Sequence, residues 1–337
     1  MSNTRSQNPL VLRLGISQYQ TTDALRREQK EAEALGFRYI ASLDQTHPEE
    51  ENATVLVVNT HLQVTEEKLS LWKDCEFIIT CNSGYDNVDL KACWKRKHLA
   101  VCNLPQIRKE AVAWHTLGLM VSLTRNLFPY SKELKEGTWN RKVISHTLLL
   151  PQLEVGIVGF GNIGKSITEK LIRLGVTISV YDPYVDPLVV EEASATPLGI
   201  EAVMERADIL SLHCPLTDET KNLVDAKALK RMKQGALLVN TARGALIDPK
   251  ALLDALKTNH LSGAGIDVYS EEPPFSNPTW QEILKFDSVI TTPHAAGHSQ
   301  DLVERVVTET IDALERFRHK RAQISLLVPA RLPWLRV

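Results

Sequence analysis

Three ionisable residues, Arg243, Glu272 and His294, each follow a short apolar run in the second half of the sequence, in "LLVNTARG", "DVYSEEPP" and "TTPHAAG". A guanidinium can orient a carboxylate through paired hydrogen bonds that a lysine cannot match. An imidazole titrates near neutral pH and can protonate a developing alkoxide, and a neighbouring carboxylate favours its charged form. The sequence contains no G-x-S-x-G or equivalent nucleophile motif, so these residue types predict acid–base chemistry on an anionic substrate.

Taken singly, each of the three residues also fits an ordinary position at the surface. Arg243 could lie in a turn beside Gly244, Glu272 in a solvated loop and His294 in a turn after a proline. Their common placement after apolar runs is harder to explain in this way, because the carboxyl ends of parallel strands meet at one edge of a sheet, where ligands bind.

A glycine motif precedes these residues in "EVGIVGFGNIGKSITEKLIRLG", where Gly159, Gly161 and Gly164 have G-x-G-x-x-G spacing between an apolar strand and a helix. The first glycine makes a tight turn, the second lets backbone approach a pyrophosphate, and the third lets the helix pack on the strand. The helix start offers N–H groups and a positive dipole end to phosphates. The alternative is a purely structural turn.

Asp182 closes the next apolar run, "TISVYD". A carboxylate there accepts hydrogen bonds from ribose hydroxyls and repels a 2'-phosphate, so the motif favours NAD over NADP; a helix-capping aspartate is the alternative. A nicotinamide cofactor together with a carboxylate-orienting cation and an acid matches what hydride transfer to a 2-keto acid requires.

Short apolar runs alternate with segments of helical period along the chain, which predicts parallel sheets with helices on both faces. In the first third we expect strands at 10–16, 37–41, 54–59, 76–80 and 99–103. A long helix is expected from near Arg108 to about Asn126, followed by the polar stretch "FPYSKELKEGTWNRK". A second series then begins at "EVGIVGFG" and continues through "TISVYD", "DILSLH", "GALLVN", "GAGIDV" and "SVITTP".

One more helix is expected near the end of the sequence, where apolar residues recur at steps of three and four, and such a stripe needs a core to cover. Its members are Leu302, Val303, Val306, Val307, Ile311, Leu314 and Phe317. The tail after it, "ISLLVPARLPWLRV", contains two prolines, which favour a docked, extended segment over another helix.

The composition restricts the possible partners. Lys and Arg number 39 against 41 acidic residues, a net charge of -2 over 337 residues, which argues against nucleic acid or an anionic membrane. Five cysteines without C-x-x-C spacing predict reduced core residues, with no disulfide framework and no metal site. We find neither a signal peptide nor an apolar segment of membrane-spanning length, and we expect a cytoplasmic protein.

The motifs "VGFGNIG", "DILSLHCPLTDETKNLVD", "MKQGALLVNTARGALID", "GAGIDVYSEEP" and "TTPHAAG" resemble, as an ordered set, the D-isomer-specific 2-hydroxyacid dehydrogenase family. The resemblance implies an α/β protein with two lobes, in which a Rossmann-type NAD-binding domain (109–300) is inserted into a flavodoxin-like substrate-binding domain (1–108 and 301–337). It also implies that the terminal helix packs on the first lobe.

The resemblance assigns roles to individual residues. Arg243 would orient the substrate, His294 would be the acid/base and Glu272 its partner. Gly159, Gly161, Asn162, Ile163 and Gly164 would meet the pyrophosphate, and Asp182 the adenosine ribose. The remaining cofactor contacts would come from His213, Cys214, Pro215 and Thr220 on the adenine side and from Thr241, Ala242 and Asp267 on the nicotinamide side. "NSGYDNVD" resembles the turn whose amides hold the substrate carboxylate, through Asn82, Ser83 and Gly84.

The sequence departs from the family pattern in three places. Asn82 stands where the first glycine of the substrate turn usually lies, Trp114 in "AVAWH" replaces an acidic residue, and "LPQLEVGIVG" lacks the usual glycine and lysine. The first two weaken any assignment of the substrate by analogy. "KEGTWNRK" resembles the arm that relatives use to embrace a second subunit, which implies a homodimer; an ordinary surface loop is the alternative.

We therefore expect an enzyme that uses NADH to reduce a small anionic 2-keto acid to the D-2-hydroxy acid, or runs the reverse reaction. Hydroxypyruvate, glyoxylate and 3-phosphohydroxypyruvate are candidate substrates, and Arg108 or Lys109 could meet a second anionic group. The alternative is a silent, NAD(H)-sensing scaffold, because corepressors with this fold exist in the family. Formate oxidation is disfavoured by Glu272, where such relatives carry glutamine, and a long-form phosphoglycerate dehydrogenase by the absence of a C-terminal regulatory domain.

Overall fold

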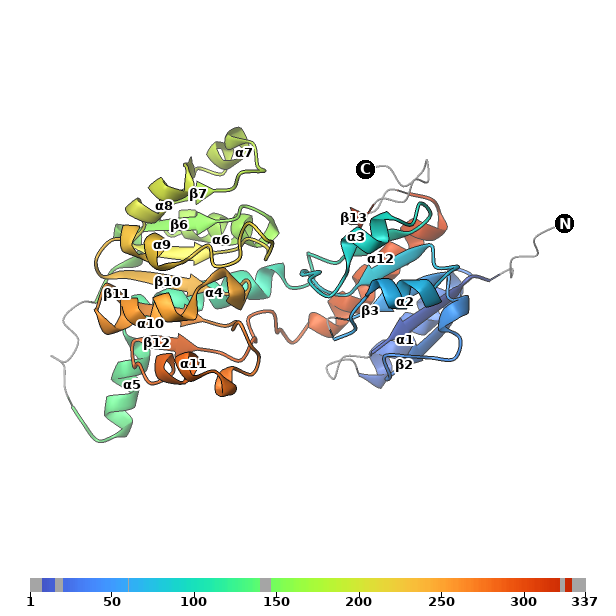
Figure 1. Cartoon of the computed structure of the whole chain (residues 1–337), viewed down its shortest axis with the longest axis horizontal. Helices are drawn as coiled ribbons and strands as arrows, with labels where there is room; N and C mark the ends of the chain where they lie inside the picture. Colours follow the sequence, from blue (N-terminus) through green and yellow to red (C-terminus); the bar gives the residue numbers. More distant parts are fainter. Residues whose placement is uncertain (1–7, 16–20, 60, 140–146, 322–324, 329–337) are drawn as a thin grey trace. The chain divides into compact units, whose positions relative to one another are not determined.

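The computed structural model describes residues 8–15, 21–59, 61–139, 147–321 and 325–328. The chain forms two compact units, which we call the first unit (Met1–Arg108 with Ser299–Val337) and the second unit (Lys109–His298) (Figure 1). The expected α/β architecture with parallel sheets is confirmed in both. None of the helices in the described ranges combines the length and apolar character that crossing a bilayer requires.

The first unit contains a sheet in the order β13-β5-β4-β3-β1-β2. Its parallel strands are β1 (Leu10–Leu14), β2 (Arg38–Ser42), β3 (Val55–Val58), β4 (Phe77–Thr80) and β5 (Ala100–Asn103). The order 2-1-3-4-5 is that of flavodoxin-like sheets, as expected. Each strand predicted between residues 10 and 103 is present, displaced by no more than a residue or two.

Helices cover both faces of this sheet (Figure 1). They are α1 (Thr22–Ala34), α2 (Glu66–Leu71), α3 (Leu90–Trp94) and α12 (Leu302–Arg318), with the 3-10 turn η1 (Glu50–Asn52). The apolar stripe of α12 packs on the sheet as predicted, and the ring of Phe317 stacks on Phe77 with centroids 5.1 Å apart. Thr21, Thr65 and Asp89 cap the first three helices, because each side chain accepts a backbone N–H of the first turn.

The segment after α12 adds a strand, β13 (Leu326–Val328), which pairs antiparallel with β5. The predicted extended, docked tail is therefore present over these residues. Residues 324 and 329–337 of the tail lie outside the described part of the chain.

The second unit contains a parallel sheet in the order β12-β11-β10-β9-β6-β7-β8. The strands are β6 (Glu154–Val158), β7 (Thr177–Tyr181), β8 (Thr196–Pro197), β9 (Ile209–Leu212), β10 (Ala236–Asn240), β11 (Leu261–Ile266) and β12 (Val289–Thr291). The strand order reverses between β6 and β9, which is where ligands bind in doubly wound sheets. The short β8 was not expected.

The helices of this unit also form two layers (Figure 1). They are α4 (Lys109–Thr124), α5 (Leu127–Lys135), α6 (Asn162–Arg173), α7 (Pro187–Glu192), α8 (Ile200–Arg206), α9 (Ala226–Arg231), α10 (Pro249–Lys257) and α11 (Pro278–Ile283). Short 3-10 turns are η2 (Leu150–Gln152), η3 (Gly244–Leu246) and η4 (Pro274–Ser276). The apolar residues of α4 and α6 pack on one face of the sheet, and those of α9 and α10 on the other.

The stretch expected to be only a polar connection after α4 is helical from Leu127 to Lys135. Asn126, with a φ of 51°, ends α4 and turns the chain. Pro129 does not prevent α5, because it lies in the first turn, where its missing N–H has no helical partner. Residues 140–142 of the predicted arm lie outside the described residues.

Candidate functional site

The candidate residues of the second unit follow the carboxyl ends of its strands. Gly159 follows β6, Asp182 follows β7, and His213 follows β9. Arg243, Asp267 and His294 come shortly after β10, β11 and β12. Since the sheet is parallel, all of these strand ends lie at one edge. The strand order reverses between β6, which precedes the glycine loop, and β9, which precedes His213.

The glycine loop needs glycine at two of its three positions for steric reasons. Gly159 has a φ of 96°, and a Cβ there would lie 2.6 Å from the backbone nitrogen of Cys214. A Cβ on Gly164 would lie 2.1 Å from the carbonyl oxygen of Gly159. A Cβ on Gly161 would meet nothing within 4 Å, so space is open beside the start of α6. Open space in front of the first amides of a twelve-residue helix fits a pyrophosphate.

Asp182 holds the glycine loop against the end of β7. One carboxylate oxygen accepts the N–H of Phe160 at 2.7 Å, and the other accepts the N–H of Tyr184 at 2.9 Å. The carboxylate is therefore fixed next to the loop, with lone pairs left over for further donors.

His213, across the point of strand reversal, has a buried ring nitrogen. Its Nε2 lies 2.9 Å from the Ser211 hydroxyl, whereas its Nδ1 has no hydrogen-bond partner among the described residues. Desolvation lowers the pKa of His213 to about 4, so the ring is neutral at physiological pH. A buried polar atom without a partner next to the glycine loop fits a site that a polar ligand completes.

The neighbouring predicted contacts, Cys214 and the turn that follows it, are ordered by local bonds. The Thr220 hydroxyl donates to the Pro215 carbonyl at 2.7 Å and accepts the N–H of Thr217 at the same distance. Burial, followed by the charge of Asp182, raises the pKa of the half-buried Cys214 thiol to about 11, so the thiol is protonated and unreactive.

Arg243 is held by a residue that sequence reasoning missed. The fully buried Asn240 side chain donates to the Arg243 carbonyl at 2.8 Å and accepts the N–H of Ala242 at 3.0 Å, which closes the turn after β10. The φ of Gly244 is not positive, so this turn does not use the conformational freedom of glycine. Glycine is needed there because a Cβ would lie 1.9 Å from the backbone carbon of Tyr269.

Glu272 and His294 meet, as expected. Nδ1 of His294 lies 2.7 Å from one carboxylate oxygen of Glu272, and the other oxygen accepts the N–H of Tyr269 at 3.2 Å. Partial burial would raise the pKa of Glu272, but the hydrogen bond and charge of His294, the Tyr269 N–H and the charge of Arg243 together lower it. The pairing engages Nδ1 and leaves Nε2 as the nitrogen that can exchange a proton with a ligand.

Asp267 shapes the turn that carries His294. Its fully buried carboxylate accepts the N–H groups of Ala295 and Ala296 at 2.8 and 2.9 Å, and its carbonyl accepts the N–H of His294 at 2.8 Å. These bonds support a left-handed backbone at His294, with a φ of 53°.

Thr292 and His115 support Asp267 and were not predicted from the sequence. The Thr292 hydroxyl donates to Asp267 at 2.5 Å, and Nε2 of His115 lies 3.0 Å from the same hydroxyl. The hydroxyl of Thr241, a predicted contact, lies 2.9 Å from that of Thr116. The sequence signal for Thr292 is weak, because Thr292 is simply a polar residue at the end of an apolar run.

The predicted substrate turn lies in the first unit, after β4. The carbonyl of Asn82 accepts the N–H of Leu104 at 3.1 Å, and the carbonyl of Ser83 accepts the Asn103 amide at 2.6 Å. Asn82 does not have a positive φ, so its replacement of the usual glycine requires no left-handed backbone.

Two other positions noted in the sequence have ordinary surroundings. Trp114 on α4 is exposed, with the Lys170 ammonium 5.4 Å from its ring centroid. Lys109 begins α4, and its ammonium nitrogen lies 4.0 Å from a carboxylate oxygen of Glu110. Among the described residues, no group of three or more His, Cys, Asp or Glu side chains could hold a metal ion.

The chain is similar to known proteins along most of its length. A family model described as "D-isomer specific 2-hydroxyacid dehydrogenase, NAD binding domain" matches residues 117–296. The D-3-phosphoglycerate dehydrogenase of Methanocaldococcus jannaschii is 34% identical over 267 residues, which cover 79% of this chain and 50% of that protein. The hydroxypyruvate reductase of Thermotoga maritima is 31% identical over 260 residues, 77% of this chain and 83% of that protein. This chain thus spans about half the length of the first relative and most of the second.

A solved structure has the same fold. The crystal structure of the D-lactate dehydrogenase of Aquifex aeolicus, complexed with NAD and lactic acid, has a TM-score of 0.82 at 26% sequence identity. The likeness covers 94% of this chain and 99% of that one.

Proposed function

Because the chain belongs to the D-isomer-specific 2-hydroxyacid dehydrogenase family, we propose that it interconverts a small 2-keto acid and the corresponding D-2-hydroxy acid with NAD(H). The observation that carries the proposal is the 2.7 Å contact between His294 and Glu272 at the sheet edge where Arg243 also emerges. This edge joins an acid/base pair and a carboxylate-binding cation to the glycine loop.

The chain's own residues then have the following roles. Arg243 binds the substrate carboxylate and polarises the keto oxygen through its guanidinium. His294 donates a proton from Nε2 to that oxygen during reduction and takes it back in the reverse direction, and Glu272 holds the ring through Nδ1. Bound NADH supplies the hydride, or NAD accepts it. The N–H groups of Ser83 and Gly84 bind the substrate carboxylate.

The cofactor contacts follow from the loops at the carboxyl edge of the sheet. We assign the pyrophosphate to Gly159, Gly161, Asn162, Ile163 and Gly164, and the adenosine ribose to Asp182, whose charge disfavours NADP. Thr241, Ala242 and Asp267 serve the nicotinamide side. The adenine side is assigned to His213, Cys214, Pro215 and Thr220.

The substrate class is a small anionic 2-keto acid, and two relatives suggest members of it. The Thermotoga protein is named a hydroxypyruvate reductase and the Aquifex protein a D-lactate dehydrogenase. Hydroxypyruvate, glyoxylate, 3-phosphohydroxypyruvate and pyruvate are therefore the first compounds to test.

The test is NADH oxidation, followed by absorbance, with this panel of 2-keto acids. We expect turnover with at least one of them, and we expect Arg243→Ala and His294→Ala to lose most of it while still binding NADH. Normal rates in either variant would refute the assigned roles. If the wild type binds NADH but turns over none of these keto acids, the proposed dehydrogenase activity is refuted and a nucleotide-sensing scaffold is favoured.

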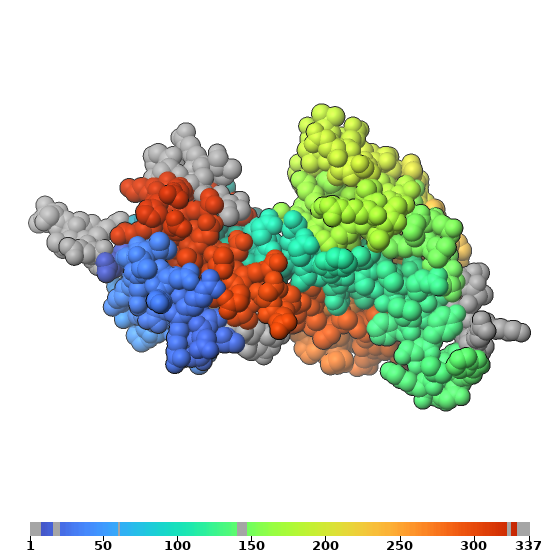
Figure 2. Space-filling model, turned by 180° about the vertical axis from the view of Figure 1, so that it is seen from behind, coloured from blue at the N-terminus to red at the C-terminus, as the bar shows by residue number. Residues whose placement is uncertain are grey.

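We also propose a homodimer, and the helix α5 supports it. α5 projects from the second unit (Figures 1 and 2), and large apolar side chains between residues 127 and 139 are exposed. Leu127 is 49%, Phe128 58%, Leu134 58% and Trp139 80% exposed. A monomer rarely exposes this many large apolar side chains along one short segment, so we propose that a second copy of the chain covers them. Sedimentation of the wild type and of Phe128→Lys tests this, and a monomeric wild type would refute it.

A further inference from the structure

The loop that carries Ser83 and Gly84 is tied to the end of the neighbouring strand β5. The Leu104 N–H donates to the Asn82 carbonyl at 3.1 Å, and Nδ2 of Asn103 donates to the Ser83 carbonyl at 2.6 Å. The Ser83 hydroxyl lies 3.4 Å from the Pro105 carbonyl. Successive carbonyl groups of the loop are thus turned toward one short segment, residues 103–105.

This attachment determines where two N–H groups point. In a planar trans peptide the C=O and the following N–H lie on opposite sides of the bond. Because the carbonyls of Asn82 and Ser83 face Leu104 and Asn103, the N–H groups of Ser83 and Gly84 point away from β5. Within the described ranges, no residue accepts a hydrogen bond from either N–H, so both are available to an anion.

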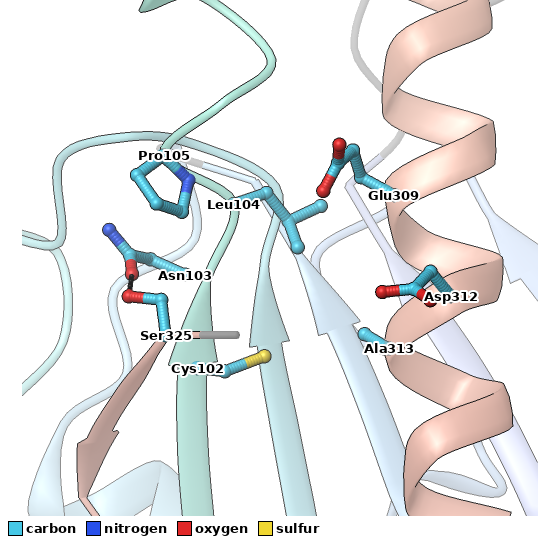
Figure 3. Close-up of a pocket in the computed structure, with 8 residues that line it drawn as sticks. All are labelled: Cys102, Asn103, Leu104, Pro105, Glu309, Asp312, Ala313 and Ser325. Carbon is cyan, nitrogen blue, oxygen red and sulfur yellow. Dashed lines mark hydrogen bonds between the residues drawn. The ribbon is translucent and has the colours of Figure 1, made fainter. Parts of the chain in front are cut away.

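The orientation of the Asn103 amide depends on a residue from the other end of the sequence. The Ser83 carbonyl can only accept, so the amide nitrogen must face it and the amide oxygen must face the opposite side. There the Ser325 hydroxyl donates to Oδ1 at 2.5 Å. Figure 3 shows this bond, with the Asn103 oxygen turned toward Ser325 and the nitrogen turned away.

Ser325 is held in place by the strand that it precedes. β13 pairs with β5 through Leu326 opposite Cys102 and Val328 opposite Val101. Asn103 is itself buried at the end of β5. The chain of bonds Ser325–Asn103–Ser83 therefore connects the C-terminal strand to the N–H groups of the loop.

We propose that Asn103 and Ser325 are positioning residues that aim the Ser83 and Gly84 N–H groups at the substrate carboxylate, so that the C-terminal strand β13 sets the affinity for the keto acid. Neither side chain needs to touch the substrate. The inference rests on the proposed function, in which these N–H groups bind that carboxylate.

Three variants test it in the full-length protein. Asn103→Asp keeps the shape of the side chain but replaces the donor to Ser83 with an oxygen, so the two oxygens repel each other. Ser325→Ala removes the hydroxyl, and Ser325→Thr keeps one. Ser262→Ala is the matched control, because this exposed hydroxyl bonds the Gly235 carbonyl in the second unit.

We expect the KM for the keto acid to rise about tenfold or more in Asn103→Asp and about three- to tenfold in Ser325→Ala. In both, kcat should change less than KM, and the Kd of NADH, measured by fluorescence, should stay that of the wild type. Ser325→Thr and Ser262→Ala should resemble the wild type. An unchanged KM in Asn103→Asp, or a parallel loss of NADH affinity, would overturn the positioning role.

Calorimetric titration with oxalate, a small dicarboxylate, gives a readout that does not require turnover. The wild type should bind oxalate more tightly than Asn103→Asp, with Ser262→Ala unchanged, and equal affinities would overturn the inference. If the wild type turns over no keto acid but the oxalate difference is present, the proposed function fails while the positioning role stands.

Discussion

Nδ1 of His294 lies 2.7 Å from Oε2 of Glu272, although the two residues follow different strands of the sheet. The contact forms because β11 and β12 are parallel neighbours, so that the loops after them emerge at the same edge. A carboxylate in this place fixes the ring and its tautomer, and the pair is the centre of the predicted acid–base chemistry.

Glu272→Gln should lower kcat by about tenfold or more, because the amide keeps the shape but loses the charge that stabilises the imidazolium. The Glu272 pKa is lowered from the ordinary value of 4.5 despite partial burial. The advantage of the wild type should therefore be complete above pH 4.5 and disappear as the pH falls through the lowered pKa, where the wild type is also neutral. Measuring kcat of both proteins between pH 4 and 9 checks this; a difference confined to acidic pH would contradict it.

Arg243→Lys should reduce kcat/KM for the keto acid by about tenfold to a hundredfold, since an ammonium cannot form the paired hydrogen bonds of a guanidinium. Arg231→Lys is the control, because Arg231 lies on α9 in ion pairs with Glu201 and Glu205. Steady-state kinetics of both variants give the answer. Equal rates for Arg243→Lys and the control would exclude Arg243 from substrate binding.

Asp182→Asn should shift the cofactor preference toward NADPH, because removal of the carboxylate removes the repulsion of a 2'-phosphate. The amide oxygen can still accept one of the N–H groups, of Phe160 or Tyr184, that the carboxylate now binds. The ratio of kcat/KM for NADH and NADPH is the measurement. A ratio identical to that of the wild type would mean that Asp182 does not face the ribose.

Gly164→Ala and Gly161→Ala should differ in stability. A Cβ at Gly164 meets the backbone oxygen of Gly159, which cannot move aside, so we expect a loss of about 1–3 kcal/mol in unfolding free energy. A Cβ at Gly161 meets no protein atom within 4 Å, so this variant should fold normally yet lose NADH affinity. Thermal unfolding and NADH titration separate the two effects. Undiminished NADH binding by Gly161→Ala would show that the open space is not the pyrophosphate site.

His213 should make the second unit sensitive to acid. Burial lowers its folded-state pKa from 6.5 to about 4, so the unfolded chain binds a proton more readily. The stability present above pH 6.5 should therefore decrease as the pH falls toward 4, by at most about 3 kcal/mol. His213→Gln should remove this part of the pH dependence. Denaturant unfolding of both proteins at pH 7 and pH 5 checks it, and parallel losses would contradict it.

The sequence by itself determined most of the order of strands and helices, though not β8 or α5. It also determined the glycine loop with Asp182 behind it, and the residues that end at one edge of the second sheet. These features depend on residues only a few positions apart: apolar period, glycine spacing and the residue that closes a run. The apolar stripe of α12 likewise showed that the helix needed a core to cover.

Only the tertiary structure decided which polar groups meet. Ser325 and Asn103 are 222 positions apart, and Thr292 and Asp267 25 apart. Whether such side chains meet depends on which strands are neighbours and in what register, and no local pattern encodes either. The support of His294 by Asp267 could therefore be found only once the sheets were assembled, because the bonds from the N–H groups of His294, Ala295 and Ala296 join two segments that the fold brings together.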